Sequence, residues 1–447
     1  MRKSKNYFVL TLFLIFISIF ARIFLLHPTF SDENFYFNVA KNLAEGKILY
    51  KDFFFAHPPF QVYLLAFLFK LFGVSFLVAK MLPLLASSFS ALMLYFIMKK
   101  LGDEKSGFIS CIFFISMPAF LAFSSLEIGV WETMVFLLLS IYLILEGKLF
   151  LSSVSFLFSF LFRYFSILYF PFLLMLAYLR NQRISKLFVY SVILFSFSFL
   201  FLIFIFGREY VIQTVSYHFL KAGISEPFSA QYWQFGYFTF FLSLISAFVS
   251  FTERKRILLL FSSVPLIIDS SLLIFLKVTF YHYFLLSLPF CVLATAKVWK
   301  DTKNRIIKLI IPTIILISIF SNLATLDFYL NPLYAKKFYQ IAEFVKENVD
   351  KNETIFGEPI ATNYASFVTG RKIAGNYLDS YLSHLKFEGE ESIIEELREY
   401  KPRVFIDMKF EGNYYFSSSQ IFKDFLKEYE VKKIIHGIPE YLLLKLI

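Results

Sequence analysis

The sequence predicts an all-α polytopic membrane protein of about eleven transmembrane helices, followed by a small extracytoplasmic α/β domain. Hydrophobic residues make up 58% of the 447 residues and charged residues only 17%, and the mean hydropathy is +0.65. So few charges cannot cover so much apolar surface in a soluble protein of this length. The composition therefore excludes a soluble enzyme, a disordered chain and a coiled coil.

Long runs without Asp, Glu, Lys or Arg supply the candidate spans, because crossing a bilayer takes about 20 apolar residues. Asp269 interrupts one run, and Arg163 separates two short ones. We expect those two short runs to form a helical hairpin with Arg163 at its tip; one long tilted helix is the alternative. The runs are 6–21, 81–98, 106–126, 133–145, 149–162, 164–179, 187–207, 227–252, 257–276, 278–296 and 309–326.

The distribution of positive charge predicts the orientation. The chain begins MRKSKN, and no small-residue cleavage site follows the first apolar run, which predicts an uncleaved span with a cytoplasmic N-terminus. Lys and Arg gather in alternate loops, which places those loops in the cytoplasm. Loops 27–60, 125–132 and 208–234 and the C-terminal tail then lie outside. Because the basic residues punctuate apolar runs and form no stripe, the pI near 9.2 does not indicate nucleic acid binding.

Residues 330–447 differ in character from residues 1–329, and the sequence predicts a domain boundary between them. From residue 327 onward there are 16 basic and 19 acidic residues, a net charge of −3, whereas the rest carries +14. Apolar residues recur at helical spacing in YAKKFYQIAEFVKENV and IIEELREY. Strands are predicted at TIFGEPI, RVFIDM, EVKKIIHG and EYLLLKL, the last two joined as a hairpin around 437–439.

The first outer loop contains an amphipathic helix with an acidic start. Ser31 is suited to cap a helix that begins at Asp32, and Gly46 is suited to end it. We expect this helix to lie in the membrane interface. Asp32 and Glu33 stand in the first turn, where the helix dipole favours ionised carboxylates. Adjacent helix residues point about 100° apart, so one carboxylate can face an acceptor while the other holds structure; two ordinary N-terminal helix acids are the alternative. The apolar face is Phe35, Tyr36, Val39, Ala40 and Leu43.

Ordered motifs along nearly the whole chain resemble the GT-C membrane glycosyltransferases, which include the protein O-mannosyltransferases and the aminoarabinose transferases of lipid A. In the first outer loop the resemblance rests on the Asp32–Glu33 pair, then AKNLAEGKILY, HPPF and LAFLFKLFG. Farther along it rests on SSLEIGVWETMVFLLLSIYL, FLFRYFSILYFP, FYHYFLLSLPF, ASFVTGRKIAG and KPRVFID. Each motif is weak by itself, but the ordered set is fairly specific.

The resemblance implies an inverting glycosyltransferase whose catalytic domain is residues 1–329. It implies transfer of a sugar from a polyprenyl-phosphate donor to an acceptor hydroxyl of a lipid, glycan or protein at the outer membrane face. An acceptor hydroxyl needs a base to take its proton, and the resemblance assigns this role to Asp32, although the sequence alone does not separate it from Glu33. Cations stabilise the leaving phosphate. Many relatives have Lys before the Pro pair and Arg after the LFG segment, where this chain has His57 and Lys80.

Further candidate site residues lie within the apolar part. Glu127 or Glu132 supplies the second acidic motif, and structural helix-end acids are the alternative. Arg163 has no other charged residue within fourteen positions on either side. A charge at membrane depth usually faces a cavity or a partner, so we expect Arg163 to contact the donor phosphate; a structural salt bridge is the alternative.

Two late segments supply the remaining candidates. Asp269 and Lys277 lie about two helical turns apart, and mutual compensation is the simplest interpretation, with a Lys277–phosphate contact as the alternative. His282 and Tyr283 match a late-span motif of the family and are candidate substrate-binding residues, against a buried structural histidine. No spacing indicates zinc. The cofactor is therefore unknown: the sequence requires none and leaves a divalent cation at the acidic residues open.

A polytopic carrier or flippase for lipid-linked sugars is the competing function. Transporters often show two related halves and charged residues at the midplane of several spans. This sequence shows no related halves, and its unusual polar residues gather in outer loops and at outer helix ends. A water-soluble outer domain also suits acceptor binding better than alternating access. We therefore favour the transferase.

Overall fold

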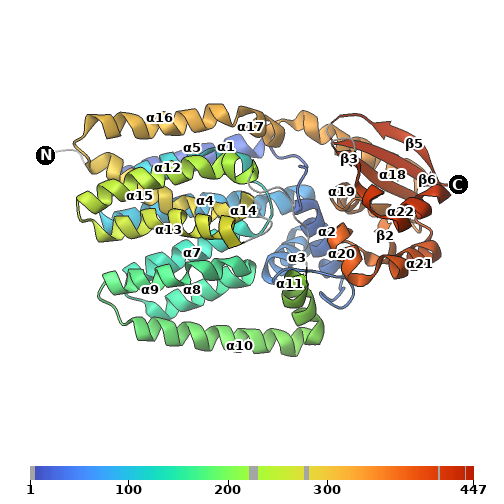
Figure 1. Cartoon of the computed structure of the whole chain (residues 1–447), viewed down its shortest axis with the longest axis horizontal. Coiled ribbons are helices and arrows are strands. Elements are labelled where there is room, and N and C mark those ends of the chain that lie inside the picture. The colour runs from blue at the N-terminus through green and yellow to red at the C-terminus, as the bar shows by residue number, and fades with distance from the viewer. Residues whose placement is uncertain (1–5, 221–229, 276–280, 411–412, 438) are drawn as a thin grey trace. The chain divides into compact units, whose positions relative to one another are not determined.

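The computed structural model describes residues 6–220, 230–275, 281–410, 413–437 and 439–447, and helices dominate it (Figure 1). The chain forms two compact units. The helical unit comprises residues 1–26, 80–202 and 224–330, and the sheet-containing unit comprises 27–79, 203–223 and 331–447. The first outer loop thus belongs to the same unit as the tail. The assignment of 1–329 as a catalytic domain and 330–447 as an extracytoplasmic domain stays a prediction.

Apolar helices make up most of the helical unit, and several helices of the chain are long enough to cross a membrane. In the described parts of the chain, four segments meet that criterion by length and composition: Phe76–Leu101, Ile184–Phe219, Phe235–Thr252 and Arg256–Ile274. A pair bent by 58°, Arg305–Ser321 with Leu323–Leu330, is a fifth candidate. Five further apolar helices are shorter, 10–17 residues. The chain is a multi-pass membrane protein, and the count of eleven spans stays a prediction.

The helices of this unit follow the charge-free runs of the sequence. Figure 1 shows many of them running side by side, and α12, α13 and α15 pack against one another. Their bounds are α1 Tyr7–Ile23, α4 Phe76–Leu101, α5 Glu104–Ser116, α6 Pro118–Phe123, α7 Val130–Leu145, α8 Leu149–Phe162, η1 Tyr164–Tyr169, α9 Phe170–Leu179, α10 Ile184–Val211, α12 Ala230–Thr252, α13 Arg256–Phe275, α14 Tyr281–Leu285, α15 Leu288–Asp301, α16 Arg305–Ser321 and α17 Leu323–Leu330.

Serine side chains line the contact between α7 and α8. The Ser140 and Ser152 hydroxyls lie 2.8 Å apart. Ser155 donates to the carbonyl of Phe136 at 2.7 Å, and Ser159 donates to that of Thr133 at 3.0 Å. Small residues let helix backbones approach closely where lipid removes the hydrophobic drive for helix association. These hydrogen bonds therefore specify how two otherwise apolar helices pair.

The helix breaks at Arg163, which excludes the single long helix. α8 ends at Phe162, and Arg163 itself is extended, with φ −150° and ψ 119°. The chain then continues as the short 3₁₀ segment η1 into α9, where Pro171 occupies a position in the first turn. Proline is well tolerated there because that turn has no intrahelical acceptor for its missing N–H.

The tail folds into a small α/β structure around a sheet of order β2-β1-β3-β6-β5, with β4 paired to β3. β1 is parallel to β2 and β3, whereas β3–β6 and β5–β6 are antiparallel. The four predicted strands and both predicted helices are confirmed. The strand bounds are β1 Thr354–Gly357, β2 Lys372–Ile373, β3 Val404–Phe410, β4 Asn413–Tyr414, β5 Tyr429–Ile435 and β6 Glu440–Leu446, and the helix bounds are α18 Lys336–Asn348, α19 Pro359–Thr369, α20 Leu382–Glu388, α21 Glu390–Tyr400 and α22 Gln420–Phe425.

The predicted strand TIFGEPI is too long at its C-terminal end, because α19 begins within it. β1 ends at Gly357, Glu358 accepts hydrogen bonds from the N–H groups of Ile360 and Ala361, and Pro359 opens the helix. An oxygen-bearing cap followed by Pro at the first helical position is a typical helix start. The change from strand to helix is therefore local in origin.

The predicted outer-loop helix is α2, Glu33–Ala44, and its five predicted apolar residues are all buried. The capping prediction at Ser31 is wrong: Asp32 precedes the helix, and the Ser31 hydroxyl lies 2.9 Å from that of Thr29. The predicted end at Gly46 is confirmed, since Gly46 has φ +100° and its N–H bonds to the Leu43 carbonyl. Such a left-handed glycine is a common helix terminator. The same unit also contains α3 Phe60–Phe72, η2 Ile212–Ser216 and α11 Tyr217–Leu220.

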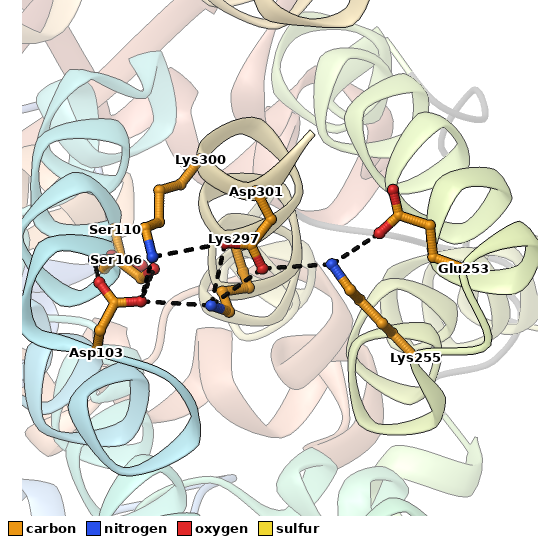
Figure 2. A network of polar contacts seen from close by, with 8 residues as sticks. All are labelled: Asp103, Ser106, Ser110, Glu253, Lys255, Lys297, Lys300 and Asp301. Atoms are coloured by element: carbon orange, nitrogen blue, oxygen red, sulfur yellow. Dashed lines mark hydrogen bonds and ion pairs between the residues drawn. The ribbon is translucent and has the colours of Figure 1, made fainter. Parts of the chain in front are cut away.

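A network of ion pairs connects the start of α5, the end of α15 and the turn between α12 and α13 (Figure 2). Asp103 caps α5 and accepts from Lys300 at 2.5 Å and Lys297 at 3.3 Å. Lys297 continues to Asp301 at 3.0 Å, and Lys255, between α12 and α13, also reaches Asp301 at 3.3 Å. Burial alone would raise the pKa of Asp103, but hydrogen bonds from Lys300 and Ser106 outweigh it and hold that pKa well below its usual range.

Removing the charge of Asp103 should weaken this network without removing the helix cap, because Asn is also a good N-cap. We expect Asp103→Asn to destabilise the detergent-solubilised protein by about 1 kcal/mol or less at neutral pH. The loss should shrink as salt is added, because salt screens partly exposed pairs. Thermal unfolding of wild type and variant at low and high salt measures both effects.

Asp424→Asn is the control, because Asp424 pairs with Lys427 in an exposed position on the tail. It should change thermal stability less than Asp103→Asn. Equal effects of the two substitutions would show that the network contributes no more than an ordinary surface pair.

Candidate functional site

Asp32 lies at the start of α2 and binds a residue of the tail. The Tyr381 hydroxyl donates a hydrogen bond to Asp32 Oδ1. The carbonyl of Asp32 accepts from the N–H of Tyr36, which begins the helical hydrogen-bond pattern. The Asp32 side chain is only partly buried. This carboxylate is therefore oriented by a neutral donor and remains accessible.

Glu33, the next residue, has a different environment. Its side chain is 0% exposed, and Oε1 accepts a hydrogen bond from the Thr29 hydroxyl at 2.6 Å. The two acids of the pair are thus separated by burial: Asp32 can reach a ligand, whereas Glu33 is held inside the unit. This arrangement agrees with the expectation that one carboxylate of the pair is accessible and the other is structural.

The polar side chains of α2 bind the tail through α19. Asn38 Nδ2 donates to Asn363 Oδ1 at 3.0 Å, and both residues are buried. Asn363 Nδ2 in turn bonds to the carbonyls of Pro359 and Leu378. Lys41 Nζ lies 3.4 Å from the carbonyl of Ser366. Helix α2 is therefore enclosed by protein on its polar face as well as its apolar face, and its predicted place in the membrane interface stays a prediction.

Two acids of the tail lie near the parallel strands β1 and β3, and the sequence analysis did not identify either. Glu358 directly follows β1 and Asp407 lies on β3, and both are buried. Burial raises the pKa of Glu358 to about 7, and the negative charges of Asp407 and Asp32 add to this rise. Burial likewise raises the pKa of Asp407 to about 6. Both acids fall within the predicted strands TIFGEPI and RVFIDM, and an acid near the C-terminal end of an otherwise apolar strand was the available signal, because ligand sites often form at the carboxyl ends of parallel strands.

His57 lies among aromatic rings in the same unit. Its ring centroid lies 5.6 Å from those of Tyr36 and Phe55 and 6.0 Å from that of His218. The Tyr50 hydroxyl donates to the His57 carbonyl at 2.7 Å. His218 Nε2 bonds to the Ala56 carbonyl at 2.6 Å. The backbone around His57 is therefore fixed from two sides.

A glutamine after α10 also holds this loop. Gln213 Oε1 accepts from the N–H of Phe55 at 2.9 Å, and its Nε2 donates to the carbonyl of Tyr50 at 2.8 Å. Both atoms of one buried amide are thereby used on the segment that leads to His57. No sequence motif pointed to Gln213, because the contact joins residues more than 150 positions apart.

In the helical unit, the structure brings together Arg163, Glu127 and Glu132. All three side chains are buried. Arg163 Nε donates to the carbonyl of Ile128 at 2.7 Å, next to Glu127 in the chain. Glu132 interacts electrostatically with both Glu127 and Arg163. Glu127 and Glu132, the two candidates for the second acidic motif, therefore lie close together, and both stay candidates.

Two of the late candidates belong to the same group. The charge of Arg163 acts on His282, and the ring of Tyr283 lies 5.1 Å from that of Phe165. Lys80, in the second turn of α4, is buried with an exposed fraction of 1%. Lys277 lies outside the described residues.

Asp269 has partners other than the predicted Lys277. The Ser287 hydroxyl donates to Asp269 Oδ1 at 2.6 Å, and the Tyr169 hydroxyl lies 2.8 Å from that of Ser287. These three residues come from α13, η1 and the start of α15. One oxygen of the buried carboxyl group is thus hydrogen-bonded, which lowers the cost of burying it in an apolar bundle.

Within the described ranges, no group of three or more His, Cys, Asp or Glu side chains is arranged to hold a metal ion. The candidates described above divide between the two units. Asp32, Glu33 and His57 belong to the sheet-containing unit, and Lys80, Arg163, Glu127, Glu132, His282 and Tyr283 belong to the helical unit.

No protein-family model matches the sequence, and no curated protein sequence matches it. Solved structures do match. ArnT from Cupriavidus metallidurans bound to undecaprenyl phosphate gives a TM-score of 0.67 over 99% of this chain and 98% of that chain, at 9% identity. The apo state of the same protein gives 0.64 over 98% and 97%, also at 9% identity. The oligosaccharyltransferase of Archaeoglobus fulgidus tethered with an acceptor peptide gives 0.51 over 90% and 69%, at 12% identity.

At these identities the likeness establishes the fold. The chain has the GT-C fold that its ordered motifs led us to expect, over nearly its full length. The roles of individual site residues rest on the geometry described above and stay proposals.

The raised pKa of Glu358 makes a prediction about pH and stability. The folded chain holds this proton to about pH 7, whereas an unfolded glutamate loses it near 4.5. Stability should therefore fall as pH rises through this window. Glu358→Gln keeps one capping oxygen and does not titrate. We expect the stability of the Gln variant relative to wild type to rise between pH 5 and pH 8, by about 1–3 kcal/mol in total.

Thermal unfolding of the solubilised protein across this pH range measures the difference. Glu343→Gln, at an exposed position of α18, is the control and should track wild type at every pH. A Glu358→Gln difference that does not change with pH would contradict the raised pKa.

Proposed function

We propose that the protein is an inverting glycosyltransferase that uses a polyprenyl-phosphate sugar as donor and a hydroxyl group as acceptor. The observation that carries the proposal is the separation of the acidic pair, in which Asp32 is accessible and oriented while Glu33 is buried. It occurs at the position where the sequence resembles the GT-C enzymes. The shared fold with ArnT, one structure of which holds undecaprenyl phosphate, supports the donor class.

The proposed reaction is a single displacement at the anomeric carbon. The acceptor oxygen forms a new bond to that carbon while the bond to the phosphate oxygen breaks, so the configuration inverts. Asp32 takes the proton of the acceptor hydroxyl, which is a poor nucleophile until this proton leaves. The polyprenyl phosphate departs with the bonding electrons as an anion.

Cationic and polar side chains are the proposed contacts of the leaving phosphate, because fixed charges stabilise the negative charge that develops there. We assign this role to Arg163, with His57, Lys80, Lys277, His282 and Tyr283 as further candidates. Glu127 and Glu132 form the proposed second acidic motif beside Arg163. The acceptor is a lipid, a glycan or a protein.

We propose that the reaction takes place at the outer face of the cell membrane. The charge asymmetry of the loops supports a cytoplasmic N-terminus and an extracytoplasmic tail. A lipid donor would lie in the bilayer with its head group at that face. The donor would then reach the site from within the bilayer that surrounds the protein.

The test of the function is incubation of the purified protein with a set of undecaprenyl-phosphate sugars, followed by mass spectrometry of released undecaprenyl phosphate. Release from one member of the set, dependent on Asp32, supports the transferase. Movement of an intact lipid-linked sugar across vesicles without release would instead support the carrier, which a carboxamide at position 32 need not impair.

Asp32→Asn should abolish most of the transfer. Asn keeps the size of the side chain and still accepts a hydrogen bond from Tyr381, but it cannot take a proton. Loss of a general base typically lowers the rate about 10²–10⁴-fold, with folding and donor binding retained. Initial rates of undecaprenyl phosphate release measure the effect.

Glu33→Gln is the matched control, because its carbonyl can still accept from Thr29. It should reduce the rate less and act mainly through stability. If Asp32→Asn transfers normally while Glu33→Gln is inactive, the roles of the pair are reversed; if both transfer normally, the loop is not the catalytic centre.

Arg163 variants should lose affinity for the lipid phosphate. Lys keeps the charge but loses the bidentate geometry of the guanidinium, and Met loses both. We expect undecaprenyl phosphate to bind more weakly to Arg163→Lys and weaker still to Arg163→Met, measured by titration with the lipid in detergent.

A second buried arginine of the helical unit supplies the control for this experiment. Arg22 donates to the hydroxyls of Ser87 and Ser88 at 2.8 and 2.6 Å. Arg22→Met should destabilise the bundle without a specific loss of lipid phosphate binding. Unchanged binding in a folded Arg163→Met protein refutes the role of Arg163.

A further inference from the structure

We propose that Tyr381, in the tail, is a positioning residue for the Asp32 carboxylate, so that the tail takes part in the catalytic step. The inference rests on the proposed role of Asp32 as the base. The phenol of Tyr381 donates a hydrogen bond to one carboxylate oxygen, Oδ1. The two residues are 349 positions apart, and the fold of the sheet-containing unit brings them together.

The hydrogen bond leaves the second oxygen of Asp32 for the acceptor. Among the residues that the structure describes, none donates a hydrogen bond to Oδ2. A hydrogen bond to one oxygen restricts rotation of the carboxylate, which limits the positions that the other oxygen can take. Such fixed orientation is a large part of what a catalytic site contributes to rate.

The backbone around Tyr381 is itself anchored, which makes the phenol a fixed donor. The preceding residue, Ser380, donates to the Gly357 carbonyl at 2.6 Å at the end of β1. The following residue, Leu382, donates its N–H to the Tyr415 hydroxyl at 3.3 Å. His384, in the first turn of α20, bonds through Nδ1 to the Asp379 carbonyl. A side chain held by supports on both sides is suited to preorganise another group.

The phenol also remains a donor at working pH. Burial raises the pKa of Tyr381 well above its usual value, and the negative charge of Asp32 adds to the rise. The other charged or titratable groups that act on Tyr381 are Tyr415 and Glu358. Tyr381 therefore keeps its proton, and its role is to orient Asp32 and stabilise its ionised form rather than to transfer a proton.

Tyr381→Phe tests the proposal, because it removes only the hydroxyl. A hydrogen bond to a charged group predicts a fall in kcat of about 10- to 100-fold, with KM for the undecaprenyl-phosphate sugar unchanged. Because a hydrogen bond from a hydroxyl favours the ionised form of a carboxylate, its loss should also move the acid limb of the pH–rate profile to higher pH. Replacement of Tyr381 by 3-fluorotyrosine, a stronger donor, should move the same limb to lower pH.

A labelling experiment gives a readout that does not need turnover. Dicyclohexylcarbodiimide modifies protonated carboxyl groups, so the pH at which Asp32 becomes labelled, measured by peptide mass spectrometry, should rise in Tyr381→Phe. Tyr441→Phe is the matched control. The Tyr441 hydroxyl is buried and has no hydrogen-bond partner in the described part of the chain, so its loss should change neither the rate nor the labelling.

The possible outcomes separate this inference from the proposed function. A lower kcat in Tyr381→Phe with an unchanged acid limb and unchanged labelling overturns it, because a merely structural role gives that result. An unchanged kcat overturns it as well, while the role of Asp32 stands if Asp32→Asn is inactive. If Asp32→Asn is fully active, the proposed function fails first. Should Tyr381→Phe not fold, the 3-fluorotyrosine variant decides the question. A shift of the acid limb of its pH–rate profile to lower pH supports the proposal, and an unchanged limb overturns it.

Discussion

The arrangement of the sheet-containing unit depends on the packing of α2 against α19. Helix α2 has buried Asn34, Asn38 and Asn42 on one side and buried apolar residues on the other. Its amide groups need partners of fixed geometry, and Asn363 supplies one of them. Because Asp32 immediately precedes α2, whatever fixes this helix also fixes the acidic pair. The tail is therefore part of the structure that presents Asp32, whichever acceptor the protein uses.

The helical unit also contains buried charged residues that need partners. Arg163 and Asp269 each interrupt apolar sequence, and each is costly to bury alone. Arg163 donates to the carbonyl of Ile128 and interacts with the carboxyl group of Glu132, whereas Asp269 accepts from the hydroxyl of Ser287. The guanidinium of Arg163 can stabilise the negative charge of a phosphate, whereas a carboxyl group such as that of Asp269 cannot. This difference is why we place Arg163, and not Asp269, in the proposed site.

The sequence predicted what local patterns encode. Charge-free runs located the helices, alternation located the strands, and an isolated Arg163 marked a helix break. The buried face of α2 followed from its spacing. Local patterns do not encode contacts between distant segments, and so Tyr381, Gln213 and Asn363 were missed. The strand expected at TIFGEPI was too long because strand and helix signals overlap at Glu358 and Pro359.

The same distinction explains why the sequence alone did not separate the two acids of the pair. In sequence, Asp32 and Glu33 are equivalent acids at a helix start, and the helix dipole acts on both. Their difference arises from residues that come before and long after them in the chain. Thr29 donates a hydrogen bond to Glu33, and Tyr381 donates one to Asp32. A base must be ionised, oriented and accessible at once. Glu33 is buried and Asp32 is partly exposed, so accessibility favours Asp32 as the proposed base.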